Sequence, residues 1–198
     1  QGHKRAYKAH QAHVPCAESQ GGNREGIFVG VILKYYDLSF PEGIVAGIGF
    51  EKVFALGSDL SCTSSSSNTK ASVVYGNGET LGKLEKSARA VVPIDFQVSN
   101  TLLARLSEHS TAICLPISKI LESSGLEQQY LLHSASMLAK KAIEKNVRLS
   151  IASFAQSKDY ACSPVQLISI AKLIGMTEEE ARLSISAVNF EIGVNDEE

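Results

Sequence analysis

The chain has 198 residues, 44% of them hydrophobic, and a formal net charge of −2, a composition typical of one soluble globular core. Charged residues separate the short apolar runs 27–33 and 44–50, which excludes a transmembrane helix, and the acidic balance argues against a free-standing nucleic-acid binder. The four cysteines are far apart and form no C-x-x-C pair, which predicts reduced thiols in a cytoplasmic protein.

Residues 1–27 are polar and contain Gly21-Gly22-Asn23, so we predict a flexible extension outside the fold. His3, His10 and His13 lie in this extension beside basic residues. They leave open an arm that binds metal or RNA, although three histidines without cysteine or carboxylate partners are a weak ligand set. The chain shows no secretory signal and does not begin with methionine, which is consistent with a trimmed start.

The remaining residues, 28–198, are predicted to form a single α/β domain in which strands and helices alternate. Runs rich in β-branched and aromatic residues predict strands at 28–40, 52–56, 71–75, 90–94 and 111–115. Helices are expected at 79–88 and from Ser99 or Asn100 to residue 109. The serine-rich segment 58–70 is predicted to be a solvated loop.

The last third of the chain has the clearest local signals. Ser124-Gly-Leu-Glu127 has the spacing of a capping box and predicts a helix that ends at Asn146. The predicted buried stripe of this helix is Tyr130, Leu131, Ser134, Met137, Leu138 and Ala142. Residues 147–152 are predicted to be a strand, and 153–162 a polar loop.

Two further helix starts follow this loop. Ser163-Pro164-Val165-Gln166 is a second capping box with proline at the first helical position, and that helix is expected to end at Gly175. Its predicted buried stripe is Val165, Ile168, Ala171 and Ile174. Thr177 and the three glutamates after it start a third helix.

The alternation of elements predicts a parallel α/β sheet, organised as a TIM-barrel-like β/α repeat. About six strands can be counted, fewer than the eight of a closed barrel. Either the barrel is incomplete or neighbouring elements are merged in this count.

Several short motifs occur together in the last third of the chain. They are Val147-Arg148, Ala152-Ser153-Phe154-Ala155-Gln156, Pro164 with Leu167-Ile168, Ile174-Gly175-Met176, Ala181, and Ser184-Ile185-Ser186. Together they resemble ribonuclease P protein component 3, the barrel-shaped protein subunit of the archaeal ribonucleoprotein that processes the 5′ end of tRNA. Residues 102–121 and Tyr36-Asp37-Leu38 are similar to that family's preceding helix and strand and to its opening strand. The resemblance spans about residues 34–190.

The resemblance implies a subunit of ribonuclease P, an endonuclease that removes the 5′ leader from precursor tRNA and whose RNA subunit looks to be the catalyst. It implies no cofactor on this chain and magnesium on the RNA. The implied partners are ribonuclease P RNA, a small α/β ribonuclease P protein as direct partner, the other ribonuclease P proteins, and precursor tRNA as substrate. Such a subunit neutralises phosphates and recognises RNA shape.

Basic residues around the last predicted strand are the candidates for RNA contact, namely Arg148, Lys158, Lys145, Lys141 and Lys140. Arg148 matches the family's basic position after valine, Lys158 lies in the loop that leaves the strand, and the other three lie on the preceding helix. Together with Glu144 and Asp159 they give a local charge of +3, whereas residues 28–198 carry 15 basic and 19 acidic residues. For each of these basic residues, the alternative is an ordinary solvated charge or an interaction with the helix dipole.

The chain departs from the family pattern in three places. Ala161-Cys162-Ser163 stands where the family usually carries an arginine, and Val165-Gln166 replaces a basic-acidic pair. Residues 187–190 lack the family's usual proline. The first two departures argue against RNA contact by this loop and leave the fold expectation unchanged.

No catalytic site of the chain's own is predicted. Distantly similar metal-dependent phosphoesterases would carry a His-x-His pair where this chain has Tyr36-Asp37-Leu38-Ser39. Asp37, Asp59 and Asp95 are interpreted as cap or turn residues, and no nucleophile elbow, P-loop or zinc pattern occurs.

Two alternatives stay open. The first is a barrel-type metal-dependent phosphoesterase, which metal content and activity without RNA would distinguish. The second is a scaffold that binds the partner protein and has no salt-dependent affinity for RNA.

Overall fold

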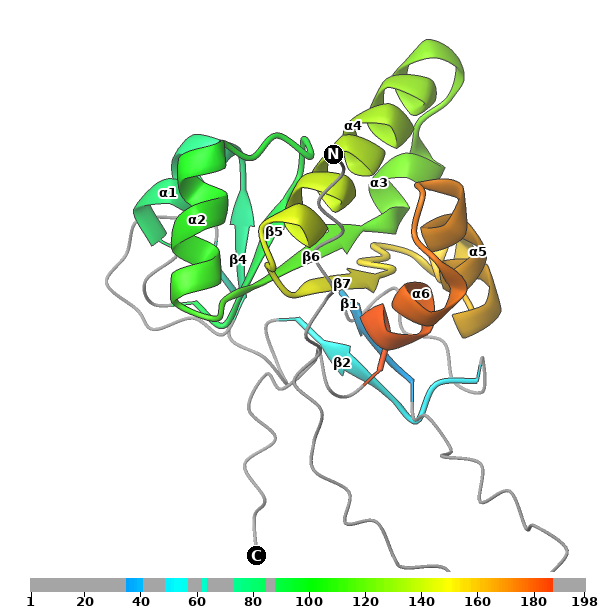
Figure 1. Ribbon diagram of the computed structural model, residues 1–198. Helices are drawn as coiled ribbons and strands as arrows, with labels where there is room; N and C mark the ends of the chain where they lie inside the picture. The colour runs from blue at the N-terminus through cyan, green and yellow to red at the C-terminus, as the bar shows by residue number, and fades with distance from the viewer. Residues whose placement is uncertain (1–34, 41–48, 57–61, 64–72, 85–87, 187–198) are drawn as a thin grey trace, which may run out of the picture. The chain divides into compact units, whose positions relative to one another are not determined.

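Figure 1 shows a computed structural model of the chain, which describes residues 35–40, 49–56, 62–63, 73–84 and 88–186. The predicted extension 1–27 and the residues from 187 onward lie outside these ranges. Within them, strands and helices alternate and all paired strands are parallel, so the prediction of a mixed α/β fold with parallel sheets is confirmed.

The described residues contain two parallel sheets. One sheet pairs β1 (Tyr36–Ser39) with β2 (Lys52–Ala55). The other follows the order of the chain, with β3 (Cys62–Thr63), β4 (Val73–Gly76), β5 (Ala90–Pro93), β6 (Ala112–Pro116) and β7 (Leu149–Ala152). The two-residue β3 lies inside segment 58–70, so the prediction of a loop throughout that segment is wrong. Strand pairing uses main-chain groups, so β3 can pair with β4 although its sequence has no apolar pattern that indicates a strand.

Helices follow most of the strands. They are α1 (Gly78–Leu84), α2 (Asn100–Glu108), α3 (Ile117–Glu122), α4 (Gly125–Glu144), α5 (Pro164–Leu173) and α6 (Glu178–Ser184), with a 3₁₀ turn, η3, at Lys158–Tyr160. Ser99 caps α2 as predicted, since its hydroxyl accepts a hydrogen bond from Leu102 N at 3.1 Å. The sequence did not predict α3, which directly follows β6 and has no side-chain cap to mark its start.

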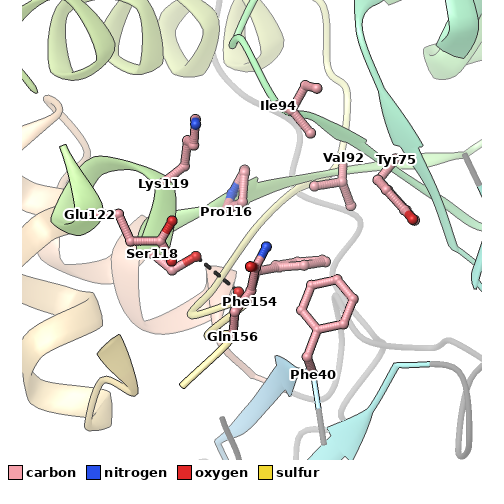
Figure 2. Close-up of a pocket in the computed structure, with 10 residues that line it drawn as sticks. All are labelled: Phe40, Tyr75, Val92, Ile94, Pro116, Ser118, Lys119, Glu122, Phe154 and Gln156. Atoms are coloured by element: carbon pink, nitrogen blue, oxygen red, sulfur yellow. Dashed lines mark hydrogen bonds between the residues drawn. The ribbon is translucent and has the colours of Figure 1, made fainter. Parts of the chain in front are cut away.

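One face of the strands contributes to an apolar cluster that draws on both sheets, which we call the inner cluster. Its buried members are Leu38, Phe54, Leu56, Val73, Ala90, Val92, Ala112, Cys114, Ala152 and Phe154. Large side chains come from β1 and β2, whereas β5, β6 and β7 contribute mostly small ones. Phe40, Val92 and Phe154, drawn in Figure 2, continue this face to the carboxyl ends of the strands.

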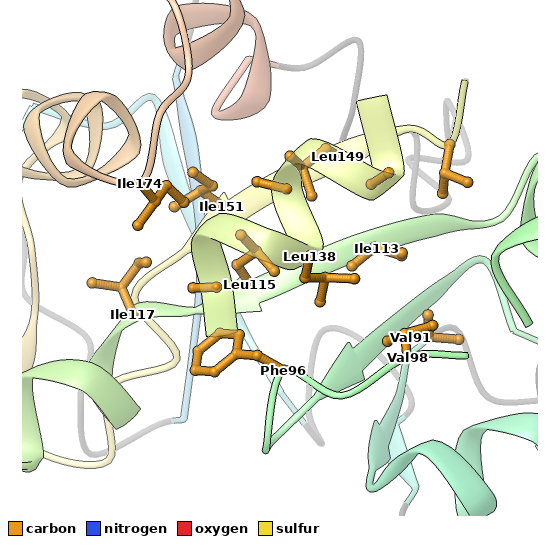
Figure 3. Packing of buried hydrophobic residues seen from close by; sticks show 14 of the residues in the cluster. Val91, Phe96, Val98, Ile113, Leu115, Ile117, Leu138, Leu149, Ile151 and Ile174 are labelled. Carbon is orange, nitrogen blue, oxygen red and sulfur yellow. The ribbon is translucent and has the colours of Figure 1, made fainter. Parts of the chain in front are cut away.

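The opposite face of the five-stranded sheet packs against helices. Figure 3 shows Ile113, Leu115 and Ile151 from the sheet beside Leu138 of α4, in a second cluster of buried side chains. Every residue of β5, β6 and β7 is buried. Strands covered on both faces are typical of parallel sheets in α/β proteins.

Backbone hydrogen bonds join the two sheets at the end of β7. Phe154 N donates to Leu38 O at 2.8 Å, and Phe40 N donates to Ala155 O at 3.1 Å. Residue numbers rise together along the two segments, so β1 and the chain that leaves β7 run in the same direction. The strand order therefore continues from β7 to β1 and then to β2.

Three residues predicted to be buried are exposed. Tyr130 and Met137 on α4 are 58% and 42% exposed, and Val165 on α5 is 72% exposed. The buried residues of α4 are Leu131, Ser134, Ala135, Leu138, Ala139 and Ala142. An apolar residue at the edge of a stripe is covered or exposed according to the rotation of the helix against the sheet, which the pattern alone does not determine.

Of the two capping boxes predicted in the last third of the chain, the one at α5 is present and the one at α4 is not, and α6 has a capping box that was not predicted. At α5, Ser163 Oγ accepts from Gln166 N at 3.4 Å, and Gln166 Oε1 accepts from Ser163 N at 2.7 Å. Thr177 begins α6 with an equivalent capping box. Ser124 makes no side-chain cap hydrogen bond, so the capping box predicted at α4 is wrong. Gly125 follows it with a φ of +58°, which changes the path of the chain into the first turn.

Replacing Ser163 by alanine is expected to lower the free energy of unfolding by about 1 kcal/mol, because the variant loses the hydroxyl that caps α5. Ser124→Ala is the matched control and is expected to change the free energy by less than about 0.5 kcal/mol, since that hydroxyl makes no cap hydrogen bond. Urea unfolding followed by circular dichroism measures both values. Equal losses in the two variants would contradict the different roles of these serines.

Candidate functional site

The five basic residues predicted to contact RNA lie at two ends of β7. Lys140, Lys141 and Lys145 lie at the C-terminal end of α4, and Arg148 directly precedes β7. Lys158 follows the other end of β7, in η3. A strand rises about 3.3 Å per residue, so the two ends of the four-residue β7 lie about 13 Å apart, and Lys158 lies six residues beyond the second end. The structure therefore groups four of the candidates and leaves Lys158 apart from them.

Arg148 has a structural contact that the sequence did not indicate. Its Nη2 donates to the carbonyl of Ser110, in the turn before β6, and the side chain is half-buried. Ser110 has a φ of +54°, and the guanidinium satisfies the carbonyl of this tight turn. Substitution of Arg148 would therefore affect stability as well as any contact with RNA.

Beside the α4 lysines, exposed side chains of α4 line a hollow of about 240 Å³. Tyr130, Met137 and Lys141 line it from α4, and Gln97 lines it from the chain before α2. Gln97 Nε2 donates to Tyr130 Oη and to Ser134 Oγ, both at 3.4 Å. The exposure of Tyr130 and Met137 thus gives this surface an apolar part next to its basic end.

Asp37 is a buried carboxylate and neither caps a helix nor forms a turn, so the sequence-based interpretation is wrong for this residue. It is 1% exposed and accepts hydrogen bonds from Ser153 N at 2.6 Å and from the Ser153 hydroxyl. Burial raises the pKa of Asp37 from 3.8 to about 6, against the opposing effect of the hydrogen bonds from Ser153. Asp95 does form the predicted turn, since it accepts from Gln97 N at 3.0 Å, and Asp59 lies outside the described residues.

Two thiols are influenced by the charge of Asp37. Cys114 and Cys162 are buried, and neither forms a disulfide in the described part of the chain. Burial, and in second place the charge of Asp37, raises the pKa of both thiols, that of Cys162 to about 11. A thiol that stays protonated at neutral pH is a poor nucleophile and a poor metal ligand.

A cavity of about 290 Å³ opens at the carboxyl ends of the strands, and we call it the strand-end cavity. Its lining comes from the ends of β1, β4, β5, β6 and β7 and from α3. Figure 2 shows Lys119 and Glu122 on one side of the view and Phe40 and Tyr75 on the other. Ligands of parallel α/β folds bind at this end of the strands, so this cavity is the candidate site for a small ligand.

Phe154 contributes a wall to the strand-end cavity from an unusual backbone conformation. It has a φ of +50°, a left-handed conformation that costs a bulky residue about 1–3 kcal/mol. Two hydrogen bonds hold it, since Phe154 N donates to Leu38 O at 2.8 Å and Phe154 O accepts from Ser118 Oγ at 2.9 Å. The surrounding structure thus holds the backbone of Phe154 in this conformation.

The strand-end cavity has no counterpart among the predictions from the sequence. Its residues are scattered from Phe40 to Gln156, and no motif connects them. One signal could have found them: in a parallel sheet, the residues that end successive strands meet at one edge. Phe40, Ile94 and Pro116 each end or directly follow a strand.

Neither a metal site nor a membrane span is found in the part of the chain that the structure describes. No group of three or more His, Cys, Asp or Glu residues there could hold a metal ion. His109 is the C-cap of α2, and His133 lies exposed on α4. No described helix combines the length and the apolar character needed to cross a bilayer.

Among known proteins, no family model and no curated sequence matches this chain. The residues described above are therefore the basis for any assignment of function.

Proposed function

We propose that this chain is a protein subunit of ribonuclease P that supports RNA-catalysed removal of the 5′ leader from precursor tRNA. The observation that carries the proposal is the junction of β1 with the chain that leaves β7. Asp37 and Leu38 bond there to Ser153 and Phe154. These residues belong to two of the motifs that resemble ribonuclease P protein component 3, Tyr36-Asp37-Leu38, which is similar to its opening strand, and Ala152-Ser153-Phe154-Ala155-Gln156. Two motifs of one family that lie 116 residues apart in the sequence are thus direct neighbours.

The same junction supports a TIM-barrel-like arrangement. In such a barrel the last strand lies beside the first, and the strands share an interior filled by side chains. The order from β3 to β7 and on to β1 and β2 fits this scheme, and the inner cluster supplies one apolar interior from both sheets. Pairing of β2 with β3 would close the ring, and residues 57–61 between them lie outside the described part of the chain.

The chemistry of the described residues favours a supporting role over catalysis by this chain. The strand-end cavity has aromatic walls, and the buried Asp37 is held by Ser153. In the proposed complex the RNA subunit binds magnesium and performs the cleavage, and a small α/β protein subunit is the direct partner. We expect this complex in the cytoplasm, together with the other ribonuclease P proteins.

Phosphate contact is proposed for the basic end of α4 and for the 3₁₀ turn. Lys140 and Lys145 are exposed, Lys141 and Arg148 are half-buried beside them, and Lys158 is exposed at the other end of β7. RNA that touches both positions would extend along the length of β7. Because four of the five residues lie at the α4 end, this end is expected to contribute more to RNA affinity.

Binding of ribonuclease P RNA to the chain and its small partner subunit tests the proposal. The variant Lys140→Gln, Lys141→Gln, Lys145→Gln is expected to bind more weakly, with a salt slope shallower by about 2–3, because each lost phosphate contact lowers the slope by about 1. Lys158→Gln is expected to lower it by about 1. Lys83→Gln on α1 is the matched control, with no expected change. If the wild-type complex shows no salt-dependent binding of RNA, the scaffold alternative is favoured. If the salt slope is unchanged in both variants, the RNA does not contact these lysines.

A further inference from the structure

We infer that the strand-end cavity binds one unpaired nucleobase, an inference that rests on the proposed function and gives it a base-binding subsite. The features that carry it are the size of the cavity, its aromatic wall, its polar side and the fixed backbone of Phe154. Nothing in the sequence motifs or in the basic residues around β7 assigns this cavity a role.

The size of the strand-end cavity limits its occupant. Its volume of about 290 Å³ lies just below the range of small-molecule sites, about 300–1,000 Å³. A cavity of this size holds a single ring system and not a folded segment of a partner. One base turned out of a single-stranded loop or bulge fits this limit, and such bases are the usual targets of sequence-specific RNA recognition.

The aromatic wall suits the flat face of a base. Phe40, Tyr75 and Phe154 come from the ends of three different strands and line the same cavity. Phe40 and Tyr75 are half-buried, so their rings are fixed by the fold and still accessible. Stacking on aromatic side chains is the main way in which proteins hold unpaired bases. The ring of Phe154 completes this wall, and two hydrogen bonds hold the strained backbone of that residue.

The polar side of the strand-end cavity suits the edge of a base. Glu122 and Gln156 are exposed and line the cavity, so a carboxylate acceptor and an amide with both donor and acceptor face the same space. Lys119, also exposed, lies one helical turn before Glu122 and supplies a cation for the phosphate. The Ser118 hydroxyl already donates to Phe154 O, so it is left to accept.

This combination favours a base over an apolar protein side chain. A leucine or phenylalanine from a partner would use the aromatic wall and leave Glu122 and Gln156 without a role. A carboxylate accepts from ring N–H and amino groups, which guanine presents together on its pairing edge, whereas uracil has no amino group. Guanine is therefore the expected preference of the strand-end cavity, and uracil the poorest fit.

NMR titration of the full chain with GMP, UMP, inorganic phosphate and N-acetyltryptophanamide tests the inference. GMP is expected to shift the ring signals of Phe40 and Tyr75 and to bind more tightly than UMP. Glu122→Ala and Tyr75→Leu are each expected to weaken GMP binding by about tenfold, through the loss of the edge contact and of stacking respectively. Glu179→Ala, an exposed glutamate on α6, is the matched control with no expected change. Circular dichroism establishes that each variant is folded.

Three results would overturn the inference. Phosphate that binds as tightly as GMP would reduce the site to the charge of Lys119. Tight binding of N-acetyltryptophanamide without nucleotide binding would assign the cavity to a protein side chain. No binding of any probe by the folded chain would leave it without a ligand of either class. If the chain still stimulates cleavage of precursor tRNA in any of these cases, the proposed function stands and the base-binding subsite alone is wrong.

Discussion

Replacing Asp37 by asparagine is expected to remove a pH dependence of about 3 kcal/mol from the free energy of unfolding. Burial raises the pKa of Asp37 from 3.8 to about 6 in the folded chain, whereas the unfolded chain keeps the ordinary value. The folded state thus holds this proton more tightly than the unfolded state. The resulting stabilisation is complete below a pH of about 4 and is lost as the pH rises to about 6.

Asparagine fits the same position without the charge. Its Oδ1 can accept from Ser153 N, and its amide can donate to Ser153 Oγ, whose proton then turns toward Leu38 O at 3.5 Å. Urea unfolding at pH 4 and at pH 7 measures the difference in stability between variant and wild type. That difference is expected to shift by about 2 kcal/mol in favour of the variant at the higher pH, since part of the effect is already lost at pH 4.

Asp159→Asn makes the same chemical change on an exposed carboxylate of the 3₁₀ turn and serves as the control. The thiols of Cys114 and Cys162 stay protonated throughout this pH range, because burial raises the pKa of both. If Asp37→Asn and the wild type differ by the same amount at both pH values, the carboxyl group of Asp37 does not have a raised pKa.

Replacing Ala152 by leucine is expected to lower the free energy of unfolding by about 2–3 kcal/mol, because the inner cluster has no room for three more carbon atoms. Ala152 is fully buried on β7, in the same cluster as Leu38 and Phe54 from the other sheet. Overpacking a filled interior forces side chains off their rotamers and shifts the backbone. The prediction therefore tests whether both sheets share one packed interior.

The matched control is Ala104→Leu, the same change at an exposed position of α2. It is expected to change stability by less than about 0.5 kcal/mol, since nothing covers that position. Thermal and urea unfolding of the two variants measure the difference. A leucine at position 152 that is tolerated as well as the one at position 104 would mean that the inner face is open, against the barrel-like arrangement.

Local signals were sufficient for most elements of the fold. Ser99 and Ser163 cap helices by bonds to residues three positions ahead, so the sequence contains both partners within one turn. The strands β5, β6 and β7 were predictable for a similar reason, since each is a short run of apolar residues between helices. Even here Ser124 shows a limit, because it has the spacing of a capping box and still makes no cap hydrogen bond, beside a Gly125 with a φ of +58°.

Contacts between distant residues could not be predicted. Asp37 and Ser153 are 116 residues apart, and nothing near Asp37 indicates that a strand end will bury it and supply two donors. The rotation of α4 depends on the sheet beneath it, so Tyr130 and Met137 were assigned to the wrong side. The strand-end cavity has the same origin, since its walls come from five strand ends and α3.

The candidate RNA contacts were predictable from the sequence only in part. The sequence identifies Lys140, Lys141, Lys145, Arg148 and Lys158 as a local excess of positive charge. It treats them as one group, whereas β7 separates Lys158 from the others, and Arg148 also supports the Ser110 turn. The sequence shows how many charged residues lie in this region, but the fold decides where each side chain lies and which residues it contacts.

Cleavage of precursor tRNA in a reconstituted system tests the central claim most directly. Ribonuclease P RNA and the small partner subunit are assayed at modest magnesium concentration with and without this chain. The wild-type chain is expected to raise the cleavage rate, and the triple variant at Lys140, Lys141 and Lys145 is expected to raise it less and with a weaker dependence on salt. No stimulation by the wild-type chain, together with phosphoesterase activity of the isolated chain with added metal, would contradict the central claim.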